Sequence, residues 1–229
     1  MQIAILALLL WATQAVATTV TAEAWIVADS DGRVIHSFNG DQVRSIASIT
    51  KLMTTMVVLD AKQPVDQKLG NHTRSELIQL AMIRSDNWAA DQLCQSYPGG
   101  RSACVQAMNR KAHELAMSNT RFVDPTGLGV MNVSTGQDLI NLVQAAKNYS
   151  EIRLASQQAW VRIGRQIVYN TNRIVNSDFL VSKTGYIRAA GGCVVMMLDT
   201  WVGRRIVILL GSRSTHTRIP EAQAVAMLF

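Results

Sequence analysis

The period of the hydrophobic pattern changes twice along this chain, and that change constrains the fold more than any other feature. Residues 24–28 and 34–38 are short apolar stretches around Asp31 and Gly32, a pattern typical of a β-hairpin. Helical spacing of apolar residues follows over residues 49–59, 75–94, 101–116 and 135–147. Strand-like stretches return at 166–169, 181–184, 193–198 and 206–210, and residues 220–229 suit a final helix with Pro220 in its first turn.

This order of elements predicts an α+β fold. An antiparallel sheet is assembled from both ends of the chain and flanked by helices, while the middle helices form a second, helical lobe. A cleft between the lobes is the expected place for a site. The chain has 229 residues, of which 48% are apolar, enough for one large domain and too many for a disordered protein.

The N-terminus carries an export signal pattern. Residues 3–12 read IAILALLLWA, and Ala15 and Ala17 follow in a small-x-small cleavage pattern, which predicts a secretory signal peptide over residues 1–17 and a mature domain over 18–229. The apolar run is shorter than the about 20 residues that span a bilayer. Because no charged side chain precedes Glu23, an uncleaved membrane anchor is the alternative.

The charge pattern argues against a nucleic-acid partner. The formal net charge is +6, but the 22 Lys and Arg residues are scattered, and their densest cluster is Arg204 with Arg205. A diffuse basic surface favours an anionic polymer or envelope. The histidines are isolated, so the sequence predicts no metal ion and no cofactor. They are His36, His72, His113 and His216.

Export would place the three cysteines in an oxidising compartment. Cys94 and Cys104 flank a segment with Pro98, Gly99 and Gly100 that reads as a turn between two helices, so this pair is favoured as a disulfide among the three pairings. Cys193 lies in the apolar run GGCVVMML and is expected to be a small buried core residue.

Ser48 and Lys51 form the first of three short motifs that carry chemistry. On a helix, positions i and i+3 share a face, so the hydroxyl and the amine can approach each other. A lysine activates a serine only if its surroundings lower the pKa of the amine. The spacing is common by chance, and its simpler interpretation is a capped helix with an exposed lysine.

The other two motifs follow in order along the chain. Ser85 and Asn87 offer a proton relay and an amide for hydrogen bonding, in what reads as a helix. Lys183, Thr184 and Gly185 lie on an expected strand, where a cation and a hydroxyl can hold a carboxylate and glycine lets a substrate backbone approach as an added strand. A lysine on an edge strand is the simpler interpretation of the third motif.

The three motifs in this order are typical of penicillin-binding proteins and class A β-lactamases. Segments beyond the motifs extend the match: residues 45–54, 83–100, 119–128, 132–135, 170–175 and 182–196. The chain resembles the low-molecular-mass penicillin-binding proteins of serine peptidase family S11, and among them the D-alanyl-D-alanine endopeptidases of the penicillin-binding protein 7-like group. The resemblance covers nearly the whole mature chain and implies a β-lactamase/DD-peptidase-like fold.

The resemblance also implies a catalytic apparatus. Ser48 would attack the carbonyl of a D-Ala residue and form an acyl-enzyme, with Lys51 as general base and Ser85 passing a proton to the leaving amine. The substrate would be a peptidoglycan stem peptide in the periplasm, and β-lactam antibiotics would be covalent inhibitors.

Five further residues would bind the substrate in this resemblance. Asn87 would position it, while Lys183 and Thr184, next to Gly185, would hold its carboxylate. The backbone N–H of Tyr186, with that of the nucleophile, would form the oxyanion hole.

Three other functions compete with this one, and each requires particular residues. A class A β-lactamase needs Glu-x-x-x-Asn, but Glu114 is followed by Ser118 at the required place. A peptidoglycan-binding protein without turnover would have a damaged nucleophile or base, and both are intact. D-alanyl-D-alanine carboxypeptidase activity uses the same acylation chemistry, and only the closer resemblance favours the endopeptidase.

Overall fold

The computed structural model describes residues 20–228, so the expected signal peptide over residues 1–17 lies outside the described residues, as does Phe229. The helices are α1 (Thr50–Asp60), α2 (Arg74–Gln79), α3 (Asn87–Gln95), α4 (Gly100–Glu114), α5 (Gly136–Ala146), α6 (Ser150–Gln157) and α7 (Arg218–Leu228). The strands are β1 (Ala24–Asp29), β2 (Val34–Phe38), β3 (Arg44–Ser45), β4 (Lys68–Leu69), β5 (His72–Thr73), β6 (Val133–Ser134), β7 (Trp160–Ile163), β8 (Gln166–Tyr169), β9 (Phe179–Ile187), β10 (Gly191–Thr200) and β11 (Gly203–Ser212).

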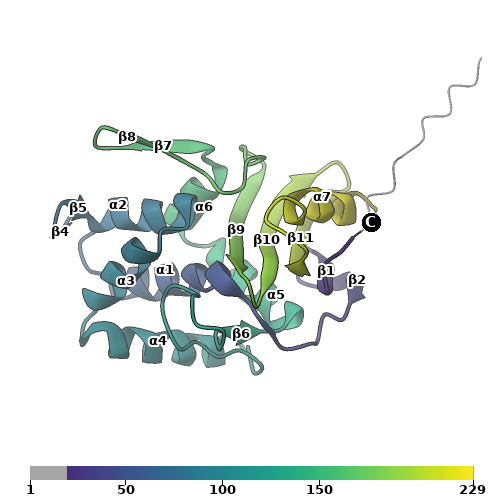
Figure 1. The fold of residues 1–229 in the computed structure, drawn as a ribbon, viewed down its shortest axis with the longest axis horizontal. Coiled ribbons are helices and arrows are strands. Elements are labelled where there is room, and N and C mark those ends of the chain that lie inside the picture. The colour runs from purple at the N-terminus through teal and green to yellow at the C-terminus, as the bar shows by residue number, and fades with distance from the viewer. Residues whose placement is uncertain (1–19, 229) are drawn as a thin grey trace, which may run out of the picture.

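The main sheet is built from both ends of the chain. It has five antiparallel strands in the order β2-β1-β11-β10-β9, so the first hairpin pairs with the last strand (Figure 1). Ile26 of β1 lies opposite Ile208 of β11, and Val195 of β10 lies opposite Lys183 of β9. The predicted α+β class and the predicted assembly of the sheet are both confirmed.

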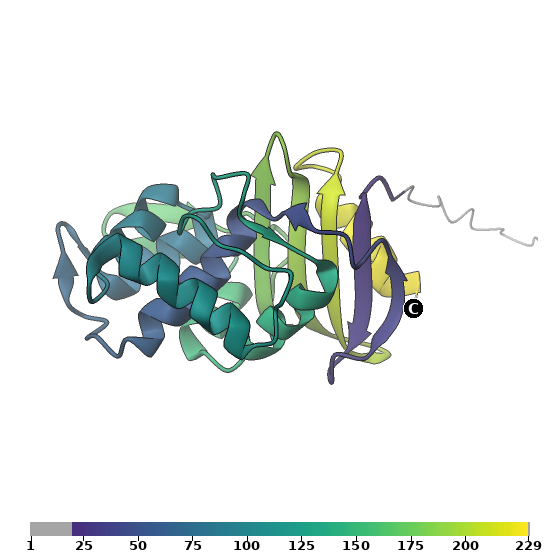
Figure 2. The ribbon, with the colours of Figure 1, turned by 90° about the horizontal axis from the view of Figure 1, so that it is seen from below.

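Helices cover both faces of this sheet (Figure 2). Val194 and Met196 of β10 belong to a cluster with residues of α7, whereas Val195 and Met197 belong to the larger core shared with α1 and α5. Because neither face is left to water, β10 and β11 read as continuous apolar runs without polar alternation. Each fully buried aliphatic side chain contributes about 1.5–3 kcal/mol relative to an exposed one.

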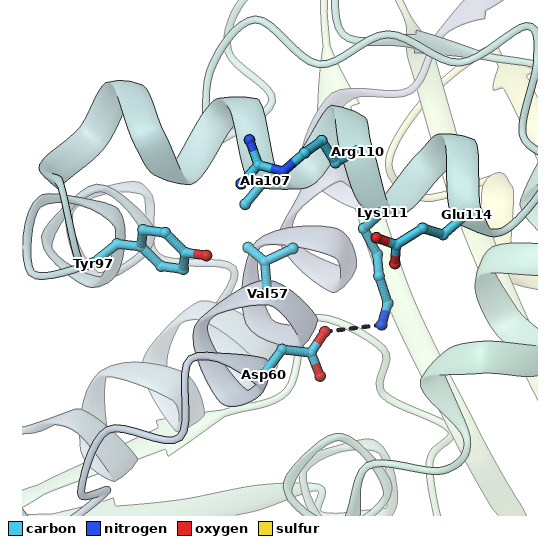
Figure 3. A pocket seen from close by; sticks show the side chains of 7 residues that line it. All are labelled: Val57, Asp60, Tyr97, Ala107, Arg110, Lys111 and Glu114. Atoms are coloured by element: carbon cyan, nitrogen blue, oxygen red, sulfur yellow. Dashed lines mark hydrogen bonds and ion pairs between the residues drawn. The ribbon is translucent and has the colours of Figure 1, made fainter.

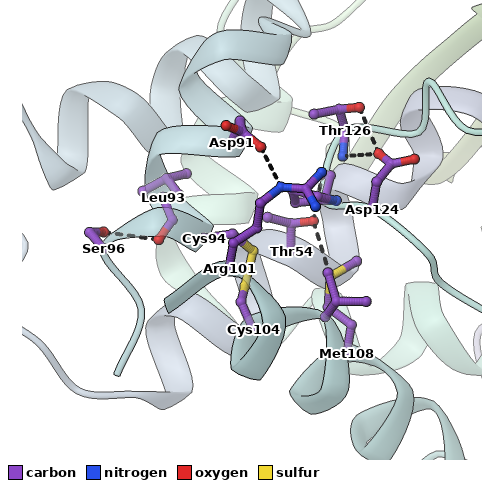
Figure 4. Close-up of a disulfide and its surroundings, with 12 residues drawn as sticks. Thr54, Asp91, Leu93, Cys94, Ser96, Arg101, Cys104, Met108, Asp124 and Thr126 are labelled. Carbon is purple, nitrogen blue, oxygen red and sulfur yellow. Dashed lines mark hydrogen bonds and ion pairs between the residues drawn. A yellow bond between two sulfur atoms is a disulfide. The ribbon is translucent and has the colours of Figure 1, made fainter. Parts of the chain in front are cut away.

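The helical lobe is arranged around α1. The side chains from Thr50 to Val58 are all buried, so α1 is surrounded on every side, as its Met-rich apolar pattern predicts. Helices α3 and α4 pack against it, and a disulfide joins Cys94 of α3 to Cys104 of α4 (Figure 4). A bridge that closes a loop of this length contributes about 2–3 kcal/mol to stability.

The predicted single helix over residues 75–94 is wrong. The chain forms α2, then a π-helical turn at Leu80–Arg84, and breaks at Ser85, whose φ of 62° is left-handed, before α3 begins. Asp86 caps α3 by accepting a hydrogen bond from the backbone N–H of Ala89 at 2.9 Å. The motif with Ser85 and Asn87 therefore lies at a break between helices. The prediction missed this break because the spacing of apolar residues does not reveal a single residue in the left-handed conformation.

Other expected elements are confirmed, and a few were missed. Thr135 caps α5 by accepting from the Asp138 N–H, and α7 carries Pro220 in its first turn. Sequence periodicity did not find α6 or β7, which are eight and four residues long, nor the two-residue strands. Among residues 20–228, no helix combines the length and the apolar character needed to cross a membrane.

Candidate active site

Ser48 lies in a single 3-10 turn, Ala47–Ile49, that leads directly into α1. The turn is strained, because Ala47 has a positive φ of 47°. Lys51, one turn along, donates a hydrogen bond from Nζ to Ser48 Oγ at 2.8 Å. The i, i+3 spacing therefore brings the hydroxyl and the amine into contact, as the sequence predicts.

Lys51 is fully buried, which rules out the interpretation as an exposed lysine on a capped helix. Its Nζ also donates to Asn87 Oδ1 at 2.8 Å and to the Thr126 carbonyl at 2.6 Å. Burial lowers the pKa of Lys51 to about 7, although the carboxylates of Asp124 and Asp86 favour the charged form. Near neutral pH the amine can therefore lose a proton, and the freed lone pair can accept the proton of Ser48.

The loop over residues 124–132 holds the Thr126 carbonyl against Lys51. Asp124 organises this loop by accepting backbone N–H bonds from Thr126, Gly127 and Gly129 at 2.7–2.8 Å. Asn132, which is buried, donates to Asp124 Oδ2 at 2.6 Å. None of the three sequence motifs includes a residue of this loop. The available signal was Asp124, a residue type that caps its own turn.

Gly127 gives a testable constraint on this loop. Its φ is 82°, and a Cβ at this position would overlap the carbonyl oxygen of Ala47 in the 3-10 turn that carries Ser48. We expect Gly127→Ala to lower the free energy of unfolding by about 1–3 kcal/mol and to slow acylation by a penicillin, because the turn that holds Ser48 must move. Gly164→Ala is the matched control, since Gly164 also has a positive φ, of 56°, with open space where a Cβ would lie. Equal acylation rates in the two variants would contradict this role of Gly127.

The break between α2 and α3 supplies the second set of groups. The left-handed conformation of Ser85 directs its hydroxyl toward β9, where Ser85 Oγ accepts a hydrogen bond from Lys183 Nζ at 2.8 Å. Asn87, the first residue of α3, contacts Lys51 instead. One short segment thus contacts both lysines.

Strand β9 supplies the third set. Lys183 is buried and donates to Ser85 Oγ and to the carbonyl of Thr184, each at 2.8 Å. Burial holds the pKa of Lys183 well below its usual range, and the positive charges of Lys51 and Arg218 add to this effect. The Thr184 hydroxyl donates to Thr171 Oγ1 at 2.6 Å.

Gly185 lets β9 closely approach the 3-10 turn that carries Ser48. A Cβ there would lie 2.9 Å from the Ile46 carbonyl oxygen and 3.0 Å from the Ser48 backbone nitrogen. Arg218 of α7 donates to the Gly185 carbonyl at 2.7 Å, and Tyr186 is exposed beside it. Strand β9 is an edge strand of the main sheet, and its outer edge faces the helical lobe across the site.

A cleft of ≈ 210 Å³ collects these groups between the sheet and the helical lobe. It is lined by Ser48, Ser85, Asn87, Leu128, Thr171, Thr184, Gly185, Tyr186, Thr215 and Arg218. Six of the eight catalytic and substrate-binding residues named from the sequence are in this lining, and Lys51 and Lys183 lie just behind it, hydrogen-bonded to it. Sequence reasoning did not single out Leu128, Thr171, Thr215 and Arg218, because no local pattern marks them.

None of the three cysteines lines this cleft. Cys94 and Cys104 are joined by the disulfide between α3 and α4, where Arg101 forms an ion pair with Asp91 at 2.8 Å (Figure 4). Cys193 is buried, and burial raises the pKa of its thiol to about 11, so it has little thiolate character.

A separate polar cavity of ≈ 250 Å³ lies between α1 and α4, where Lys111 donates to Asp60 at 2.9 Å (Figure 3). None of the residues in its lining belongs to the three motifs.

Comparison with known proteins identifies the family. Residues 11–71 and 63–214 match peptidase family S11, described as D-alanyl-D-alanine carboxypeptidase. The chain is 38% identical to a D-alanyl-D-alanine endopeptidase of Pseudomonas aeruginosa, over 88% of this chain and 74% of the relative. It is 40% identical to a D-alanyl-D-alanine endopeptidase of Escherichia coli, over 81% of this chain and 73% of the relative.

Solved structures agree on the fold. Penicillin-binding protein D2 from Listeria monocytogenes, in its ampicillin-bound form, superposes with a TM-score of 0.84 at 25% identity, covering 92% of this chain and 97% of that one. The Streptomyces K15 DD-transpeptidase gives a TM-score of 0.84 at 23% identity, covering 91% of this chain and 97% of that one. The chain has the fold of the penicillin-binding DD-peptidases and belongs to serine peptidase family S11.

Proposed function

We propose that the protein is a D-alanyl-D-alanine endopeptidase that hydrolyses peptide cross-links of bacterial peptidoglycan through an acyl-enzyme at Ser48. The observation that carries the proposal is the contact between Ser48 Oγ and the buried Lys51 Nζ at 2.8 Å, with the pKa of Lys51 lowered to about 7. A serine hydroxyl becomes a useful nucleophile when a base of this kind takes its proton.

Acylation begins when Ser48 Oγ attacks the carbonyl carbon of the D-Ala residue and its proton passes to Lys51 Nζ. The backbone N–H groups of Ser48 and Tyr186 stabilise the resulting oxyanion, a role supported by the close approach of β9 to the Ser48 nitrogen. The C–N bond then breaks, and the proton that Lys51 took from Ser48 passes through the hydroxyl of Ser85 to the leaving amine, which leaves Lys51 neutral. Water completes the cycle by losing a proton to neutral Lys51 and attacking the ester carbonyl; the bond to Ser48 Oγ breaks, and Lys51 returns the proton to Ser48 Oγ.

Substrate binding falls to the groups on β9 and α3. Lys183 and Thr184 hold the carboxylate of the substrate, and Gly185 allows its backbone to lie against β9 as an added strand. A carboxylate beside Lys183 also favours the charged ammonium, which burial alone disfavours. Asn87 donates from its amide to the substrate while its Oδ1 accepts from Lys51.

Inhibition by β-lactams and the cellular location are part of the proposal. The ampicillin-bound form of the Listeria protein supports β-lactam binding by this chain, and we expect that binding to be covalent at Ser48. The apolar run and the cleavage pattern at residues 1–17 support export to the periplasm, with residues 18–229 as the catalytic domain.

D-alanyl-D-alanine carboxypeptidase activity is the second candidate. The family description and a Bacillus subtilis relative, the carboxypeptidase DacF at 24% identity, favour it. Endopeptidase relatives at 38% and 40% identity favour cross-link cleavage more strongly.

Product analysis separates the two candidates. Purified protein is incubated with cross-linked muropeptide dimers and, separately, with monomeric pentapeptides, and the products are resolved by liquid chromatography with mass detection. We expect the dimers to yield monomers, and the Ser48→Ala protein to yield none. Release of D-Ala from pentapeptides without cleavage of dimers would replace the endopeptidase with the carboxypeptidase.

A further inference from the structure

A second cavity lies beside the catalytic cleft, along the segment that carries the second motif. It has a volume of ≈ 300 Å³ and is lined by His72, Leu80, Arg84, Asp86, Trp88, Ile163, Arg165, Gln166 and Val168. Ser85 and Asn87 line the catalytic cleft, whereas Asp86 between them lines this cavity. Consecutive Cα atoms are about 3.8 Å apart, so the two hollows are separated by little more than one stretch of backbone. We call the second hollow the arginine cavity, after Arg84 and Arg165.

Of the two arginines that line the arginine cavity, Arg84 is paired with Asp86, and Arg165 is available to bind a ligand. Asp86 accepts hydrogen bonds from Arg84 and from the Ala89 backbone; burial works against its ionisation, but these bonds hold the pKa of the carboxyl below its usual range. His72 lies 3.6 Å from Glu76, which is itself bound in the cap of α2. Arg165 is exposed and makes no hydrogen bond or ion pair with any residue between 20 and 228.

Part of the cavity lining is apolar. Leu80, Ile163 and Val168 are buried there, and Trp88 adds a half-exposed indole. Guanidinium groups bind carboxylates through paired N–H donors, and an apolar lining accommodates the hydrocarbon part of a side chain. This combination fits an organic carboxylate on a peptide better than a free inorganic anion.

The chain around Arg165 carries one sign of charge. Residues 152–177 contain four arginines and no aspartate or glutamate, and the β7–β8 hairpin within them forms one wall of the cavity. Thr171, just after β8, lines the catalytic cleft, so residues 152–177 contribute to the lining of both the cleft and the arginine cavity. Its positive potential favours an anionic ligand at this side of the cleft.

We propose that the arginine cavity is a subsite for a free carboxylate on the peptide arm of the substrate that lies outside the scissile bond. The inference rests on the proposed function, because a cross-linked dimer has a second peptide whose own carboxyl groups stay free. Arg165 supplies the main contact, Arg84 offers its remaining N–H donors while it stays paired with Asp86, and Trp88 packs against the hydrocarbon part of the arm. The subsite would favour cross-linked substrates over short ligands that fill the catalytic cleft alone.

The test compares two variants of the same hairpin. Arg165→Gln removes the available guanidinium, whereas Arg162→Gln makes the same charge change at an exposed position of β7 that does not line the cavity. For Arg165→Gln we expect kcat/KM on muropeptide dimers to fall about tenfold, mainly through KM, relative to acylation by benzylpenicillin. On dimers whose free carboxyl groups have been amidated, Arg165→Gln and the unmodified protein should have the same kcat/KM relative to acylation by benzylpenicillin. Arg162→Gln should match the unmodified protein on all three ligands.

A binding measurement keeps the subsite separate from the proposed reaction. In a Ser48→Ala background, calorimetry should give a Kd for the acidic dimer that Arg165→Gln weakens about tenfold and that Arg162→Gln leaves unchanged. Equal losses in the two variants, or an equal loss with the amidated dimer, would overturn the subsite. If the unmodified protein cleaves no dimer, the endopeptidase proposal fails, while the calorimetric comparison still decides the subsite.

Discussion

Ser48→Ala is expected to abolish covalent labelling by a penicillin and to reduce hydrolysis of muropeptide dimers by about 10⁶-fold, the loss typical of removing a catalytic nucleophile. The substitution removes only Oγ, which contacts Lys51 Nζ and lies 3.4 Å from the Thr126 carbonyl, so the fold should persist. Labelling is measured with a fluorescent penicillin on denaturing gels, and the acylated peptide is identified by mass spectrometry.

Ser45→Ala is the matched control for this experiment. Ser45 lies three residues earlier, and its buried Oγ has no hydrogen-bond partner among the described residues, so its removal should leave both labelling and stability nearly unchanged. Persistent labelling of the Ser48→Ala protein, or loss of labelling in Ser45→Ala, would remove Ser48 from its role as nucleophile.

The second large effect concerns Lys51, which should make the acylation rate depend on pH. The base must be neutral to accept a proton, and burial lowers the pKa of Lys51 to about 7. The acylation rate should therefore fall about tenfold per pH unit below pH 7 and level off above it. Stopped-flow acylation by a chromogenic cephalosporin across pH 5–9 measures this profile.

Lys51→Met should lower the acylation rate by about 10²- to 10⁴-fold and remove the inflection near pH 7, because the variant has no amine to take the proton. Lys68→Met, at an exposed position of β4, makes the same change of charge and should keep both the rate and the inflection. A Lys51→Met protein that is folded by circular dichroism and still shows the wild-type pH profile would exclude Lys51 as the base.

Much of the fold follows from local pattern. The first hairpin follows from Asp31 and Gly32 between two apolar stretches, and the cap of α5 follows from Thr135 just before its first turn. These elements depend on hydrogen bonds within a few residues, so their signals are local. The break at Ser85 was missed because its left-handed conformation is stabilised by contacts elsewhere, among them the hydrogen bond from Lys183, 98 residues away.

The sequence by itself determined which residues are proposed to carry the chemistry, since Ser48 and Lys51 share a helical face and the other two motifs follow in a characteristic order. The tertiary structure alone decided the pKa values and the hydrogen-bond partners of those residues. Lys51 has a lowered pKa because α1 is surrounded by other elements, and its partners Asn87 and Thr126 come from segments 36 and 75 residues away. A pKa depends on burial and on charges brought together across the fold, and neither quantity is encoded in a spacing of three residues.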